Sequence, residues 1–150
     1  MSSGEPAKDL ENYLHEAIPL SALMGILVDD CAEGSVTLTA PLSINHNHLG
    51  TAFGGSLAAL ATLTGYSALW TALGNKDAHI VIRRSNFEYL RPVTGDLRAT
   101  CKLPQQGISE SFTNQFRKHG KARMNLDVVI SENGNDCVHF TGEFVAITQM

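Results

Sequence analysis

The segment from Leu49 to Asn75 contains no charged side chain, and this limits the possible folds more than any other feature of the sequence. Within it, residues 55–73 predict a helix about 28 Å long, close to the width of a five- or six-stranded sheet. A helix that is apolar on nearly all sides must be surrounded, and a curved sheet wrapped around it would do so. Its glycine, serine and threonine residues do not suit a membrane span, so we expect the helix to be buried inside the protein.

Most of the remaining sequence is typical of β-strands. Six segments show the alternation or the β-branched and aromatic residues of strands: 24–32, 36–42, 79–90, 97–103, 124–130 and 138–148. The apolar spacing of residues 10–18 indicates a helix that ends at Pro19. Ile108, Phe112 and Phe116 recur every four residues and indicate a further short helix before the fifth strand. This order predicts an α+β fold with an antiparallel sheet.

Length and composition indicate a single domain that spans residues 1–150. The chain is 43% hydrophobic and 17% charged, and its length allows it to bury a sizeable core. Cys31, Cys101 and Cys137 lie far apart and form no CxxC pair, so neither a disulfide scaffold nor a structural zinc site is expected. The cysteine pattern and the polar first residues, which do not resemble a leader, predict a cytoplasmic protein.

The distribution of charge argues against a nucleic-acid partner. The net charge is −4, and residues 1–75 carry one basic side chain against seven acidic ones, whereas residues 76–150 carry ten against eight. The basic excess lies between Arg83 and Arg123 and does not form the basic stripe of a nucleic-acid-binding protein. It suits a small anionic ligand or ordinary solvated strand faces, and both interpretations stay open.

Three segments carry recognisable motifs. Residues 47–55 read Asn-His-Leu-Gly-Thr-Ala-Phe-Gly-Gly, residues 89–96 read Tyr-Leu-Arg-Pro-Val-Thr-Gly-Asp, and residues 142–145 read Gly-Glu-Phe-Val. Together they resemble the acyl-CoA thioesterases of the hotdog fold, whose signature at the entrance to the central helix is Asn-x-x-Gly-x-x-His-Gly-Gly. The sequence Gly-Thr-Ala-Phe-Gly-Gly-Ser at residues 50–56 is most similar to that of thioesterase domains found alone or fused behind a GNAT acetyltransferase domain.

This resemblance covers roughly residues 20–148 and implies a hotdog fold, in which an antiparallel sheet wraps around a long central helix. It implies hydrolysis of a small-molecule thioester, acyl-CoA or acyl-carrier protein, with no cofactor beyond the coenzyme A part of the substrate. It also implies a homodimer or a dimer of dimers, with the acyl pocket between two subunits. We expect neither a membrane nor a nucleic acid as partner.

The sequence departs from the family pattern at two positions. Phe53 occupies the place of the usual histidine, and Thr62 stands where these enzymes commonly carry an Asp or Glu on the central helix. A threonine hydroxyl is not appreciably ionised near neutral pH and does not act unaided as a general base. An alternative function is therefore a non-catalytic module that binds acyl-CoA.

Two residue positions are candidates for polarising the thioester carbonyl. The Gly55 amide, together with that of Gly54, lies at the predicted helix start, where backbone N–H groups are unpaired and glycine allows close approach. The alternative is that both glycines only form a tight turn or a close packing contact. Asn47 matches the loop asparagine of the family, and its amide would hold the carbonyl or a water; the alternative is a bond to its own loop.

Candidates for activating water are Thr62 and the histidines of the preceding loop, His46 and His48. An imidazole titrates near neutral pH, which suits a general base, whereas Thr62 would orient the water. For Thr62 the alternative is a hydroxyl bonded to a carbonyl one turn earlier, and for each histidine it is a surface position without a role. The His-x-His spacing has no third ligand at convincing spacing, so no metal site is expected.

Substrate contacts are expected from Phe53 and Gly54 at the helix start and from three arginines on the strand beside the central helix. Arg83, Arg84 and Arg91 would bind the phosphates of coenzyme A. Strand alternation places Arg83 and Arg91 on one face and Arg84 on the other. Ordinary surface charge is the alternative for all three.

Overall fold

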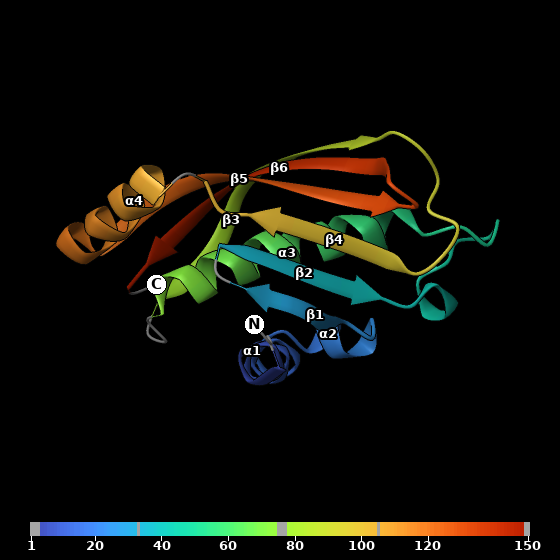
Figure 1. The fold of residues 1–150 in the computed structure, drawn as a ribbon, viewed down its shortest axis with the longest axis horizontal. Helices are drawn as coiled ribbons and strands as arrows, with labels where there is room; N and C mark the ends of the chain where they lie inside the picture. Colours follow the sequence, from blue (N-terminus) through green and yellow to red (C-terminus); the bar gives the residue numbers. More distant parts are fainter. Residues whose placement is uncertain (1–3, 33, 75–77, 105, 149–150) are drawn as a thin grey trace.

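A single six-stranded antiparallel sheet wraps around the long helix α3 (Gly54–Leu73), as the computed structural model shows (Figure 1). The structure describes residues 4–32, 34–74, 78–104 and 106–148. The strands follow the spatial order β1-β2-β4-β5-β6-β3, which makes β1 and β3 the edges. Their bounds are β1 Leu27–Ala32, β2 Ser35–Ala40, β3 His79–Tyr89, β4 Leu97–Lys102, β5 Lys121–Glu132 and β6 Asn135–Ile147.

The predicted order of elements is confirmed, including α4 (Gln106–His119), which precedes the fifth strand. Phe112 and Phe116 are buried, and α4 lies at the opposite end of the sheet from the loop that precedes α3 (Figure 1). The prediction that strand structure begins at Met24 was wrong. Pro19 occupies the first turn of a second short helix, α2 (Pro19–Leu23), and a turn through Gly25 delays β1 until Leu27.

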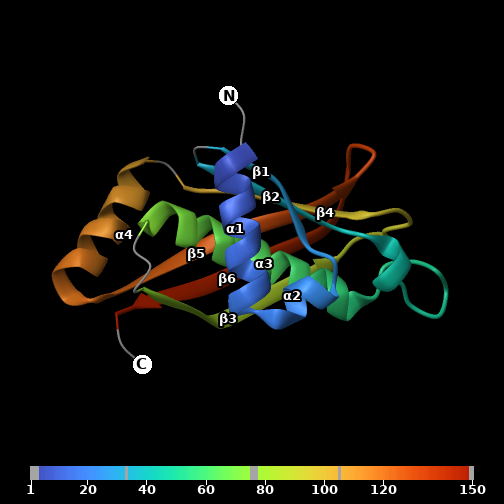
Figure 2. The ribbon, with the colours of Figure 1, turned by 90° about the horizontal axis from the view of Figure 1, so that it is seen from below.

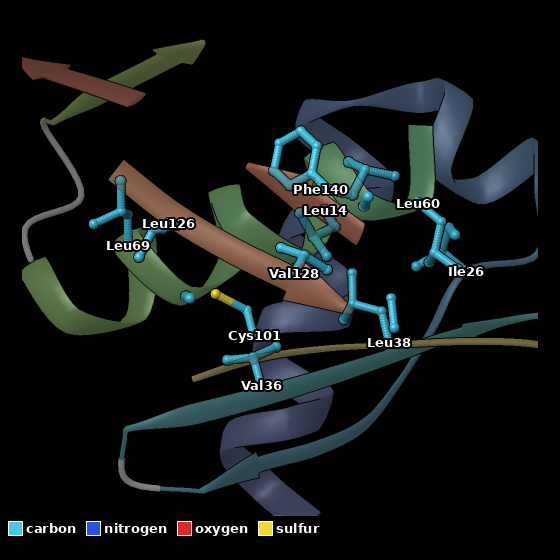
Figure 3. Close-up of a cluster of buried hydrophobic side chains, with 14 of the residues drawn as sticks. Leu14, Ile26, Val36, Leu38, Leu60, Leu69, Cys101, Leu126, Val128 and Phe140 are labelled. Atoms are coloured by element: carbon cyan, nitrogen blue, oxygen red, sulfur yellow. The ribbon is translucent and has the colours of Figure 1, made fainter. Parts of the chain in front are cut away.

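The core lies between the concave face of the sheet and α3 (Figure 3). Side chains that are almost completely buried come from both layers: Val36, Leu38, Leu60, Leu69, Cys101, Leu126, Val128 and Phe140. Gly65 lets α3 approach β6, because a Cβ there would lie 2.7 Å from the Phe144 ring. A Cβ on Gly142 would likewise collide with the Phe140 ring. By length and composition α3 passes for a membrane span, but here it is the core helix of the fold.

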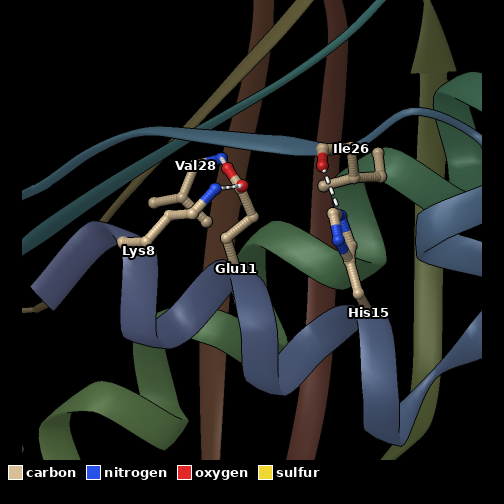
Figure 4. A network of polar contacts seen from close by, with 5 residues as sticks. All are labelled: Lys8, Glu11, His15, Ile26 and Val28. Atoms are coloured by element: carbon tan, nitrogen blue, oxygen red, sulfur yellow. Dashed lines mark hydrogen bonds and ion pairs between the residues drawn. The ribbon is translucent and has the colours of Figure 1, made fainter. Parts of the chain in front are cut away.

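Helix α1 (Gly4–Ala17) packs across α3 and against β1 (Figure 2). Its buried Glu11 accepts a hydrogen bond from the Val28 amide at 2.9 Å and pairs with the Lys8 ammonium at 2.9 Å (Figure 4). His15 contacts the carbonyl of Ile26 at 2.7 Å, and because a carbonyl only accepts, the ring nitrogen is the donor. Two side chains thus fix α1 to the start of β1.

The edge strand β3 is unusual because both of its faces are largely uncovered. Of its eleven residues, all except Ile80 and Phe87 are exposed, and Val81 and Ile82 are apolar. The outer side of an edge strand presents unpaired backbone N–H and C=O groups to another strand. The fold therefore leaves one edge of the sheet free for pairing.

We expect Glu11→Ala to destabilise the protein by about 1–3 kcal/mol at neutral pH, because it leaves the buried Val28 amide without its acceptor. Burial raises the pKa of the Glu11 carboxyl, but the bonds from Val28 and Lys8 outweigh it and hold that pKa below the ordinary 4.5. The stabilisation is therefore present above pH 4.5 and lost as the pH falls through the lowered pKa.

Urea unfolding of both proteins between pH 3 and 7 measures this difference. The matched control is Glu16→Ala, an exposed position on the same helix, for which we expect a change within about 0.5 kcal/mol. A destabilisation by Glu11→Ala that does not shrink at low pH would contradict the role of the ionised carboxylate.

Candidate functional site

The start of α3 presents backbone amides without a side-chain cap. Phe53 is the N-cap residue, its side chain makes no capping bond, and the first amide bonded within the helix is that of Leu57, to the Phe53 carbonyl at 3.0 Å. The amides of residues 54–56 precede it and have no partner inside the helix. They lie at the positive end of the helix dipole, where negative charge is stabilised.

Gly55 has both a structural and a chemical reason to be glycine. A Cβ at this position would collide with the ring of Phe53, which lies over it. Gly55 as a whole is nevertheless exposed. Gly54 is less constrained, since the nearest atom to a Cβ there is in the Tyr89 ring at 4.0 Å. The packing alternative and the predicted donor role are thus compatible at Gly55.

The amide side chain of Asn47 organises its own loop. Its Oδ1 accepts from the amides of Leu49 at 2.8 Å and Thr51 at 3.2 Å, and its Nδ2 donates to the Thr51 hydroxyl at 2.9 Å. The backbone closes the same turn, because the Asn47 amide donates to the Thr51 carbonyl at 2.7 Å. This is the local bonding that the sequence left open as an alternative, and it makes the loop rigid.

The two loop histidines differ in the hydrogen bonds that the structure records for them. His46 lies opposite Ala52 in an isolated antiparallel bridge, just before the helix start, and its Nδ1 lies 2.8 Å from the Asn47 carbonyl oxygen. Because that oxygen only accepts, Nδ1 carries the proton and Nε2 is left as a proton acceptor. His48 is exposed on the loop. Only His46 is therefore oriented by a hydrogen bond that the structure records.

The motif at residues 89–96 holds the loop before α3 in place through hydrogen bonds. Val93 is buried, and its carbonyl accepts from the Ala52 amide at 2.9 Å. Asp96 accepts from the Leu42 amide at 2.9 Å. Glu132 on β5 holds the turn, because its carboxylate accepts from the Thr94 amide and hydroxyl and from the Gly95 amide. The bond from the Thr94 amide is the main reason that the pKa of Glu132 lies below its ordinary value.

A groove of about 460 Å³ runs along the uncovered face of α3 and is open to solvent. Its lining is mostly apolar and comes from α3, β3 and the segment around α2: Ile18, Leu20, Ala58, Ala59, Thr62, Leu63, Tyr66, Ser85 and Phe87. Along α3 the lining passes from the small residues Ala58 and Ala59 to the larger Leu63 and Tyr66. The described lining contains no carboxylate and no imidazole.

Thr62 lies in this groove, as predicted from its place on the helix face. Its hydroxyl donates to the Ala58 carbonyl at 2.9 Å, which is the alternative of a bond one turn earlier. With its hydrogen used in this way, the Thr62 oxygen faces a ligand as an acceptor. Thr64 is fully buried and bonds to Leu60 in the same manner.

The three arginines do not form one cluster. A bulge between Ile82 and Arg84 breaks the strand alternation, and Arg91 lies beyond the end of β3, so the predicted sharing of faces was wrong. Arg83 pairs with Glu143 at 2.8 Å. Eight residues of extended chain, about 26 Å, separate Arg83 from Arg91. Arg91 lies beside the turn that supports the loop, whereas Arg83 and Arg84 lie toward the other end of β3.

Sequence reasoning missed Tyr66, Phe87 and Ser85, all of which line the groove. Tyr66 carried a usable signal, because it follows Ala59 by seven residues and Thr62 by four and so shares their helix face. Ser85 and Phe87 were detectable only once the edge strand was placed beside α3. Among the described residues, no group of three or more His, Cys, Asp or Glu side chains is arranged to hold a metal ion.

The sheet wrapped around a long helix, with an apolar groove along that helix, defines this chain as a thioesterase-like protein of the hotdog fold. It belongs to the family described as "Putative thioesterase (yiiD_Cterm)", whose model matches residues 7–148. The structure is similar to that of a "putative thioesterase" from Shewanella oneidensis, with 30% identity and a TM-score of 0.85 over 96% of this chain and 99% of that one.

Two further solved structures share the fold. A protein of unknown function from Chlorobaculum tepidum is 27% identical, with a TM-score of 0.86 over 95% of this chain and 94% of that one. A thioesterase from Haemophilus influenzae is 19% identical, with a TM-score of 0.74 over 94% and 90% of the two chains. The expected fold and family are therefore confirmed.

Asn47→Ala is expected to loosen the loop without unfolding the protein, because it removes the acceptor of two backbone amides. Hydrogen exchange at Leu49 and Thr51 should accelerate by about tenfold, the effect of losing a hydrogen bond of about 1 kcal/mol or slightly more. Exchange measured by NMR or mass spectrometry tests this. His48→Ala, an exposed neighbour, is the control, and equal acceleration in both variants would refute the role of the Asn47 side chain.

Proposed function

We propose that this protein hydrolyses thioesters of coenzyme A or of an acyl-carrier protein. The observation that carries the proposal is the position of the groove: its lining on α3 begins at Ala58, one turn after the unpaired amides of the helix start, and continues along Thr62 between apolar walls. This places a polar, anion-stabilising end next to an apolar channel. A thioester with an acyl tail likewise combines a polar carbonyl group, where negative charge develops, with an apolar chain.

In the proposed reaction the thioester oxygen accepts from the Gly55 amide, while the second Nδ2 hydrogen of Asn47 contributes another bond. Donors aimed at the developing oxyanion stabilise the tetrahedral intermediate. Water attacks the carbonyl carbon as His46 Nε2 takes its proton. The carbon–sulfur bond then breaks, and the proton passes to the leaving thiolate, which gives a carboxylic acid and a thiol.

We also propose that two chains pair along β3 and complete the site. The exposed edge strand and the open side of the groove are adjacent, since Ser85 and Phe87 of β3 line that groove. A second copy would cover both at once, with the basic side chains Arg83 and Arg84 or Arg91 near the rim for the phosphates of coenzyme A. Three buried, free cysteines support the cytoplasmic location that we propose.

His46→Ala should lower kcat for acyl-CoA hydrolysis by about 10²–10⁴-fold, the usual contribution of a general base. Thiol release from acyl-CoAs of several lengths measures the rate. His139→Ala is the matched control, because His139 is an exposed histidine paired with Asp136 away from the groove. Full activity in His46→Ala would show that His46 is not the general base.

The same assay separates the two candidate functions. Binding of acyl-CoA without any thiol release by the wild-type protein would favour the non-catalytic binding module, to which the threonine at position 62 also points. Release of thiol establishes the hydrolase.

Ile82→Asp should convert the protein to monomers and abolish hydrolysis, because a charge on the free edge opposes strand pairing. Light scattering coupled to size-exclusion chromatography measures the mass. Leu27→Asp places the same charge on an exposed residue of the opposite edge strand and should leave the mass unchanged. Pairing that survives Ile82→Asp but not Leu27→Asp would assign the interface to β1.

A further inference from the structure

At the far end of the groove, Tyr66 is the last α3 residue of the lining, and it belongs to an aromatic wall shared between α1 and α3. The Tyr66 hydroxyl lies 2.8 Å from the Tyr13 hydroxyl, and the Tyr13 ring stacks on Trp70 with centroids 4.4 Å apart and planes at 16°. Trp70 follows Tyr66 by one helical turn. Tyr66, Tyr13 and Trp70 therefore form one aromatic cluster at the end of the groove lining.

This wall is held in place rather than free to move. Tyr66 is half-buried, its hydroxyl is bonded across to another helix, and α1 is itself fixed to β1 by Glu11 and His15. Burial raises the pKa of Tyr66, so its hydroxyl stays neutral and bonded at physiological pH. A chain that reaches Tyr66 thus meets a rigid obstacle.

We propose that Tyr66 terminates the acyl-binding groove and restricts the substrate to medium-chain acyl thioesters. This inference rests on the proposed function, because it takes the groove as the seat of the acyl chain. It adds a specificity-determining residue and a substrate class to that function.

The dimensions of α3 give the expected length. From Gly55 to Tyr66 the helix rises about 16 Å, and the Tyr66 side chain covers the turn before its own Cα, which removes about 5 Å. An extended alkyl chain advances about 1.3 Å per carbon, given carbon–carbon bonds of about 1.5 Å. The remaining distance of about 11 Å therefore holds about eight carbons.

Binding of S-alkyl-coenzyme A thioethers of four to sixteen carbons tests this without any need for turnover. Trp70 is the only tryptophan in the chain, so its fluorescence reports ligand at the far end of the groove. For the wild-type protein the affinity should rise about fourfold for each added carbon and stop rising near eight carbons. A continued rise beyond twelve carbons, or no binding at any length, would overturn the proposal.

Tyr66→Ala should extend the rise by about four carbons, the length of the removed phenol group, and so increase affinity for the twelve-carbon thioether by about 10²-fold relative to the eight-carbon one. Tyr66→Phe keeps the ring and should keep the wild-type limit. Ala59→Met narrows the same face about two turns nearer the carbonyl end and should shorten the limit, which tests the groove even if Tyr66→Ala does not fold. An unchanged limit in folded Tyr66→Ala or in Ala59→Met refutes the assignment.

The two proposals fail separately. A length limit set by Tyr66 without hydrolysis of acyl-CoA would leave this inference standing and remove the hydrolase. Hydrolysis of acyl-CoA without any length limit would support the hydrolase and refute the role of Tyr66.

Discussion

The rest of the structure depends on how closely α3 lies against β6. Gly65 on the helix and Gly142 on the strand leave space that the rings of Phe140 and Phe144 fill. With a Cβ at either position, the rings and the helix would have to move apart, and close-packed interiors tolerate such shifts poorly. The depth at which the sheet holds α3 then determines which helix residues are covered and which are not.

The uncovered strip of α3 follows from this geometry. The sheet covers the helix only as far as β3, its last strand, while α1 contacts the helix through Tyr13. Between β3 and α2 lies the groove with Ala58, Thr62 and Tyr66. Because the groove and the free edge of β3 border the same gap, substrate binding and association with a second copy are linked in our proposal.

The reactive end of the groove owes its shape to residues that take no part in chemistry. Asn45 is buried and donates to the carbonyls of Met24 and Pro41, while its own carbonyl accepts from the Phe53 amide. Val93 and Glu132 hold the neighbouring turn. The helix start is thus fixed from several sides, which in our proposal preorganises its amides for a developing negative charge.

The sequence by itself determined the buried helix, the strands and their order, because uncharged segments and alternation reflect burial directly. Its motifs also located the loop at Asn47 and the helix start at Gly55. It did not determine the short helix α2 that begins at Pro19, the bulge at Arg83 or the direction of the Asn47 side-chain amide. Each of these depends on which of several possible local hydrogen bonds forms. Only the tertiary structure brought Tyr13, Tyr66 and Phe87 together, because strand pairing and helix packing join positions that are distant in the chain and leave no pattern in the sequence.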